Sequence, residues 1–152
     1  MARELTQQLR AYSPEVVVGV VKGGLFVGSA VAGLLGCEFI PVRLSSRSRD
    51  HGTLRADVRT AIPREVKGKR VLVVDDVMQS GETLRRAMAK ATAAGASEVR
   101  AATLVIHPKR SLQGGRRPDW FALETEDLVV FPWDYELRGG GMIESDPETS
   151  GA

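Results

Sequence analysis

The chain has 152 residues and a mass of 16.4 kDa, which is enough for one domain with its own core and too little for two full domains. It is 43% hydrophobic and 26% charged, and no apolar run approaches the ~20 residues of a membrane span, so we expect a soluble protein without a membrane partner. The polar N-terminus lacks the apolar core of a secretory signal, so we expect a cytoplasmic protein, and the single Cys37 excludes an internal disulfide and argues against a zinc site.

The first part of the chain predicts alternating helices and strands. The run "VVVGVV" is continuously apolar and β-branched, which is typical of a strand covered on both faces, and the helix after it should end at Gly36. Pro41 places the following strand toward an edge of the sheet. In chain order, the patterns predict a helix within residues 1–12, a strand at 16–21, a helix at 25–36 and a strand at 38–44.

Residues 45–69 show no sustained periodicity and are rich in Arg, Ser and Asp, so we expect a long mobile loop there. From Arg43 to Arg70 there are nine basic residues against three acidic ones, in a chain whose net charge is only +2. Such a run is commonly a solvated surface, but it also suits a polyanionic ligand, either nucleic acid or a small phosphate compound. No aromatic residues are interleaved with the arginines, which argues against single-stranded nucleic acid.

The second part of the chain continues the alternation. In chain order, we expect a strand at 70–76, a helix at 83–95, a strand at 98–106, a basic loop from 107, a strand at 128–131 and a frayed, disordered tail at 139–152. Alternating strands and helices imply a single α/β domain over residues 1–138, with a mainly parallel twisted sheet flanked by helices. In such sheets, ligands bind outside the carboxyl ends of the strands.

Two neighbouring carboxylates, Asp75 and Asp76, stand at the end of the strand in "VLVVDDVMQSGET", residues 71–83. Carboxylates this close repel each other, so an empty site that holds them is raised in energy. Three ligands or sites would explain the pair: a divalent cation, a polyhydroxylated ligand such as ribose, or an acidic pocket of the response-regulator type.

The turn after this pair leads directly into a helix, whose first backbone N–H groups have no partner within the helix. Ser80, Gly81, Glu82 and Thr83 suit a phosphate at the positive end of the helix dipole, although a plain helix start with Ser80 as N-cap explains the turn equally well. An acidic pair and a phosphate turn in one loop together favour a ribose 5-phosphate.

These thirteen residues resemble the phosphoribosyl pyrophosphate motif of type I phosphoribosyltransferases. "VVVGVVKGGLFVGSAVAGLLG" resembles the pyrophosphate loop of that family, which often contains a cis peptide, and "RLSSRSRDHG" corresponds to its flexible loop. "RRPDWFALETEDLVVFPWDYE", within a C-terminal hood at 107–136, is similar to the subgroup that uses the 6-oxopurines hypoxanthine, guanine and xanthine. The resemblance covers roughly residues 14–136 and implies a magnesium-dependent, homodimeric enzyme that makes a nucleoside monophosphate from phosphoribosyl pyrophosphate and a purine base, with no nucleic acid as partner.

The resemblance also implies a role for each matching residue. The catalytic set is Asp75, Asp76, Lys22 and, at the usual position of the base, Gln79. The phosphoribosyl pyrophosphate ligands are Lys22, Gly23, Gly24, Asp75, Asp76, Gln79, Ser80, Gly81, Glu82 and Thr83. Magnesium would be held by Asp134, Asp75 and Asp76, directly or through water. The purine base would meet Arg117, Lys109, Leu128 and Val129. The flexible loop would start with Ser45, Ser46 and Arg47.

Three positions depart from the 6-oxopurine pattern. Gln79 replaces an aspartate that handles a purine proton, and an amide hydrogen-bonds but is not a base. Leu128 replaces a stacking aromatic residue, and Arg117 replaces a lysine. Two alternatives therefore stay open: a phosphoribosyltransferase for another base or acceptor, and a non-catalytic regulator that binds phosphoribosyl pyrophosphate or a nucleotide.

Overall fold

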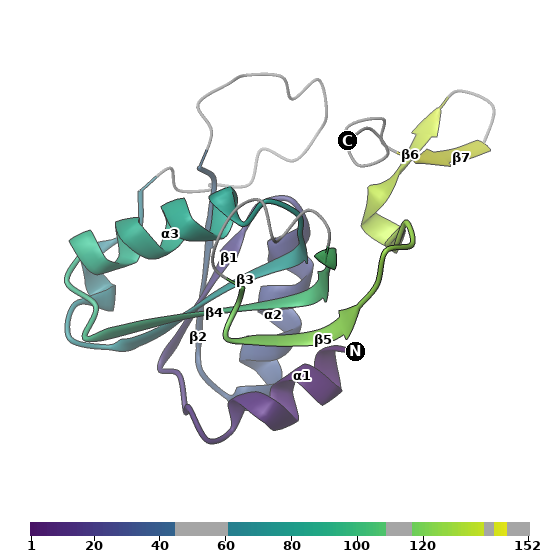
Figure 1. Ribbon diagram of the computed structural model, residues 1–152. Helices are drawn as coiled ribbons and strands as arrows, with labels where there is room; N and C mark the ends of the chain where they lie inside the picture. The colour runs from purple at the N-terminus through teal and green to yellow at the C-terminus, as the bar shows by residue number, and fades with distance from the viewer. Residues whose placement is uncertain (45–60, 109–116, 139–141, 146–152) are drawn as a thin grey trace.

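The computed structural model describes residues 1–44, 61–108, 117–138 and 142–145, and its elements alternate along the chain (Figure 1). They are α1 (Ala2–Leu9), β1 (Val16–Val20), α2 (Gly23–Leu35), β2 (Glu38–Val42), the 3-10 turn η1 (Arg64–Val66), β3 (Arg70–Met78), α3 (Glu82–Ala93), β4 (Glu98–Ile106), β5 (Trp120–Glu124), the 3-10 turn η2 (Pro132–Asp134), β6 (Tyr135–Arg138) and β7 (Met142–Ser145). Within these ranges, no helix has the length and hydropathy that a membrane crossing requires.

The main sheet has five strands in the order β2-β1-β3-β4-β5, and every neighbouring pair is parallel. This confirms the predicted α/β class. The strand order reverses between β1 and β3, and it is at such a reversal that open parallel sheets form a ligand crevice, at the carboxyl ends of the strands. A ligand site is therefore expected at the carboxyl ends of β1 and β3.

Both faces of the sheet are covered, which explains why β1 and the first half of β3, residues 71–74, are continuously apolar. Val16 and Val18 of β1 belong to a core with α3, while Val17 between them belongs to a core with α1 and α2. Figure 1 shows this arrangement, with α3 on one face of the sheet and α1 and α2 on the other. Gly36 ends α2 in the left-handed conformation at φ 69°, as predicted.

Three predicted segments differ in the structure. The late strand is β5 at Trp120–Glu124, whereas residues 128–131 form no strand. The predicted mobile loop at 45–69 lies outside the described part for residues 45–60. Within its remainder, Ile62, which precedes η1, and Val66, the last residue of η1, are buried in the core. In the tail, residues 142–145 form β7, which pairs antiparallel with β6, in place of the predicted frayed chain.

Candidate active site

A cavity of about 490 Å³ opens where β3 and β4 end. Its described lining combines residues of the β3–α3 loop, the end of β4 and the segment before η2: Asp75, Asp76, Val77, Met78, Gln79, Ser80, Gly81, Thr83, Leu84, Val105, His107, Glu126, Asp127, Leu128, Val129 and Asp134. Besides the acidic pair, this lining contains seven residues that were predicted to meet the phosphate, the base or the metal: Gln79, Ser80, Gly81, Thr83, Leu128, Val129 and Asp134. The fold therefore brings the predicted ribose, phosphate and base segments to one cavity.

The acidic pair is held by backbone donors. The N–H of Asp76 donates to Asp75 Oδ1 at 3.0 Å, and the N–H of Gly24 also donates to the Asp75 carboxylate. Burial, and then the neighbouring charge of Asp76, raises the pKa of Asp75 well above its ordinary value, although these two N–H groups act in the opposite direction. The pair thus disfavours a second negative charge, and a cation or a hydroxyl-bearing ligand would relieve this.

The predicted pyrophosphate loop packs directly against this pair. Gly23 and Gly24 are buried at the start of α2, and the peptide bond between Val21 and Lys22 is cis, as the resemblance implied. A methyl group on Gly23 would overlap the carboxylate of Asp76, and one on Gly24 would overlap the carbonyl oxygen of Val74. Glycine is needed at both positions for the loop to approach β3 this closely.

The turn from β3 to α3 leaves the start of the helix accessible to a ligand. Gly81 occupies the N-cap in the left-handed conformation at φ 75°, where a side chain would be strained and where glycine offers no capping group. Ser80 Oγ accepts the Glu82 N–H only at 3.4 Å, so it is a weak cap. The Glu82 carboxylate instead pairs with Arg85 along α3, at 2.7 Å. The backbone N–H of Glu82 is therefore the part of this residue that is suited to a phosphate.

Asp134 reaches the cavity from η2. It is 8% exposed, and its Oδ2 accepts the backbone N–H of Phe131 at 2.7 Å. Within the described residues, no group of three or more His, Cys, Asp or Glu side chains is close enough to hold a metal by itself. Asp75, Asp76 and Asp134 nevertheless offer carboxylate oxygens around one cavity, which fits magnesium, an ion that binds through one or two carboxylates, waters and substrate phosphates.

Another part of the cavity lining is formed by the end of β4 and the segment before η2. Leu128 and Val129, which the resemblance assigns to the purine base, line it, and Leu128 is 67% exposed. His107 also lines the cavity: its Nε2 lies 3.0 Å from the carbonyl oxygen of Glu126, so this nitrogen donates, while Nδ1 is buried without a hydrogen-bond partner in the described part of the chain. His107 directly follows β4, and the rule that ligands bind at the carboxyl ends of strands places it on this rim, although the sequence assigned it no binding role.

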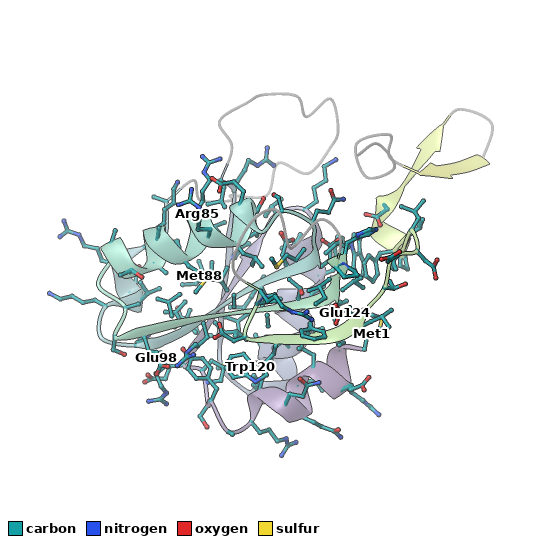
Figure 2. All side chains as sticks on the ribbon, in the orientation of Figure 1. Met1, Arg85, Met88, Glu98, Trp120 and Glu124 are labelled. Carbon is teal, nitrogen blue, oxygen red and sulfur yellow. The ribbon has the colours of Figure 1, made fainter. Side chains whose placement is uncertain are left out.

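Arg117, predicted to meet the base, does not line this cavity. Its guanidinium pairs with Glu124 at 2.7 Å and lies 5.0 Å from the centre of the Phe121 ring. It borders a separate cavity of about 200 Å³, together with Arg85 and Met88, which Figure 2 labels on α3. The remaining predicted positions, Lys109 and the loop residues Ser45, Ser46 and Arg47, lie outside the described residues.

Comparison with known families decides the assignment of this fold and site. The family model described as "Phosphoribosyl transferase domain" matches residues 1–138. The chain belongs to the phosphoribosyl transferase domain family.

Relatives of this phosphoribosyltransferase include adenine enzymes. The adenine phosphoribosyltransferase of Novosphingobium aromaticivorans is 30% identical over 138 residues, which are 84% of this chain and 75% of the relative. That of Xanthomonas axonopodis pv. citri is 34% identical over 125 residues, 75% of this chain and 64% of the relative. This chain therefore spans about two thirds to three quarters of the length of these relatives.

Solved structures with the same fold carry other names. The purine phosphoribosyltransferase of Pyrococcus horikoshii Ot3 has a TM-score of 0.69 and 28% identity over 87% of this chain and 85% of that one. A hypoxanthine phosphoribosyltransferase of Staphylococcus aureus has a TM-score of 0.64 at 19% identity, over 83% of this chain and 71% of that one, which shows the fold alone. Together the matches support a phosphoribosyltransferase of the purine-salvage type and leave the base open.

Proposed function

We propose that this protein transfers the 5-phosphoribosyl group from phosphoribosyl pyrophosphate to a purine base in the presence of Mg²⁺, giving a nucleoside monophosphate and pyrophosphate. One observation carries the proposal: Asp75, Asp76, the turn at 79–83 and Asp134 border a single cavity at the carboxyl end of β3. Each of these groups matches one part of the substrate, namely the ribose hydroxyls, the 5-phosphate and the metal-bound diphosphate.

In this proposal the protein mainly positions the substrate and balances its charge. Asp75 and Asp76 accept the ribose hydroxyls, while the first backbone N–H groups of α3 hold the 5-phosphate. Lys22 and the backbone of Gly23 meet the diphosphate. Positive charge develops on the ribose carbon that pyrophosphate leaves, and nearby carboxylates stabilise this charge. Magnesium, when bound, neutralises the departing pyrophosphate.

For the acceptor we propose a 6-oxopurine, on the similarity of the hood sequence to enzymes of that class. Adenine is the second candidate, because the relatives named above are adenine enzymes. Gln79 fits either one, since its amide both donates and accepts a hydrogen bond.

A base panel tests this choice. The protein is incubated with phosphoribosyl pyrophosphate and Mg²⁺, and separately with hypoxanthine, guanine, xanthine, adenine, uracil or orotate, while pyrophosphate and nucleotide are measured. We expect turnover of a 6-oxopurine. Turnover of adenine alone would establish the second candidate, turnover of uracil or orotate alone would exclude a purine enzyme, and tight binding without turnover would indicate a regulator.

We also propose a homodimer. Helix α2 is apolar almost throughout, yet Phe26 is 44% exposed and Leu34 is 47% exposed, with Ala30 exposed between them. A helix that is apolar on all sides is normally covered on all sides. A second copy of this chain is the partner that supplies such a cover in most oligomers.

A further inference from the structure

Trp133 contacts the acidic pair through its indole ring. The indole N–H donates to Asp76 Oδ2 at 2.7 Å, and the other oxygen of the same carboxylate accepts the backbone N–H of Val77, also at 2.7 Å. Both contacts have the length of strong hydrogen bonds to a charged acceptor. An ionised carboxylate has about four acceptor positions, so each oxygen keeps capacity for a further donor.

The Trp133 ring itself is held by two stacking contacts with other aromatic rings. It stacks on Phe26 of α2 with 5.0 Å between ring centres and 8° between planes, and on Phe131 with 4.8 Å and 7°. Such parallel aromatic contacts restrict the ring to one orientation. From this orientation the indole N–H donates to one oxygen of the Asp76 carboxylate.

The same stack joins three parts of the candidate site. Phe26 lies one turn after Gly23, which packs closely against the Asp76 carboxylate from the pyrophosphate loop. Phe131 is held through its N–H by Asp134, which lines the cavity. Trp133 lies in the same turn as Asp134, and from there it contacts both the acidic pair and the helix that follows the pyrophosphate loop.

We propose that Trp133 is a positioning residue, which fixes the Asp76 carboxylate so that its free acceptor positions face the ribose hydroxyls. This inference rests on the proposed function, because its consequence is tighter binding of phosphoribosyl pyrophosphate. The ribose contact exists in both the ground state and the transition state, so losing the indole N–H raises KM, and it also lowers kcat to the extent that the Asp76 carboxylate stabilises the positive charge of the transition state.

A double-mutant cycle on binding tests the proposal. Trp133→Phe keeps an aromatic ring in the stack and removes the N–H together with the five-membered ring of the indole, and we expect it to raise the Kd of phosphoribosyl pyrophosphate with Mg²⁺ about tenfold by calorimetry. In an Asp76→Asn background, the same change should alter Kd less than about twofold, because the charged acceptor is gone. Phe26→Leu, which keeps the N–H, is the control for stacking. Equal effects of Trp133→Phe in both backgrounds, or an unchanged Kd in the single variant, would overturn the proposal.

A second measurement keeps Trp133 in place, in case its substitution prevents folding. The chain has two tryptophans, and Trp120 lies on β5 beside Tyr12, 5.2 Å between ring centres, where it is labelled in Figure 2. In a Trp120→Phe protein, fluorescence reports Trp133 alone. We expect its emission to change and to saturate at the calorimetric Kd, and an emission that stays constant while the ligand binds would contradict the proposal.

The failure of the proposed function has a different signature. If the wild-type protein does not bind phosphoribosyl pyrophosphate, the proposed function is wrong. The hydrogen bond between Trp133 and Asp76 is still measurable, from the urea midpoints of the wild type, Trp133→Phe, Asp76→Asn and the double variant. A double variant that loses less stability than the sum of the two single variants would support this hydrogen bond, and additive losses of stability would exclude it.

Discussion

Gly23 and Asp76 lie so close together that a methyl group on Gly23 would overlap the Asp76 carboxylate. Gly23→Ala must therefore displace either the pyrophosphate loop or the acidic pair, and we expect kcat/KM for phosphoribosyl pyrophosphate to fall about 100-fold. The matched control is Gly33→Ala in the same helix, where the added methyl meets nothing within 4 Å. It should keep activity and add roughly 0.5–1 kcal/mol of stability. Equal activity of the two variants would contradict the described packing.

Asp75 gives a pH dependence with a defined sign. Burial raises the pKa of its carboxyl group above the ordinary 3.8, so between these values the folded chain binds more protons than the unfolded chain. Its contribution to stability is complete below the ordinary value and is lost as the pH rises through the raised value. Asp75→Asn should therefore gain stability relative to the wild type from about pH 4 upward, by about 1 kcal/mol at neutral pH. Urea unfolding without Mg²⁺ measures this difference, and a difference that is independent of pH would refute the assignment.

Gln79 offers a gain-of-function experiment. It lines the cavity, and the resemblance to 6-oxopurine enzymes implies an aspartate at its position; a general base contributes about 10²–10⁴-fold to rate in favourable cases. Gln79→Asp should raise kcat for a 6-oxopurine by about tenfold or more, whereas Gln79→Asn should not. If both substitutions lower the rate alike, the side chain at this position acts only by hydrogen bonding.

Leu34 tests the proposed homodimer. It lies on the exposed apolar side of α2, well along the helix from the Phe26–Trp133 stack. Leu34→Arg should convert the dimer to a monomer in light scattering, because an arginine would be buried there without a partner. Leu34→Met, which conserves volume and polarity, should remain dimeric. A wild-type protein that is monomeric at high concentration would exclude this interface.

The regular part of the fold was predictable because its signals are local. Continuous apolar runs mark β1, β3 and β4, glycine ends α2, and the α/β alternation follows from their order. Strand β5 was missed although residues 120–123 are all apolar, because the periodicity of so short a run does not identify a strand; in the structure its residues are only half-buried or exposed. Residues 128–131 have strand-like composition, but Leu128 is exposed at the cavity instead of pairing in the sheet.

The candidate site was predictable where its residues are contiguous and not where they are distant. Asp75, Asp76 and the turn after them belong to one motif, and the structure keeps them together at the cavity. Arg117 was assigned by its alignment with a lysine of the 6-oxopurine subgroup, and an alignment does not fix the direction of a side chain, which here pairs with Glu124. The hydrogen bond from Trp133 to Asp76 spans 57 positions, and no local pattern encodes such a contact.

The most direct test of the central claim is pyrophosphate release by the wild-type protein and by the variant carrying both Asp75→Asn and Asp76→Asn. Each protein is mixed with phosphoribosyl pyrophosphate, Mg²⁺ and the base that the panel selects, and melting curves confirm that both are folded. We predict base-dependent release by the wild type and a loss of at least about 100-fold in the variant, because the ribose and its metal lose their charged ligands. Undiminished release by the folded variant would contradict the assignment of this cavity as the site of phosphoribosyl transfer.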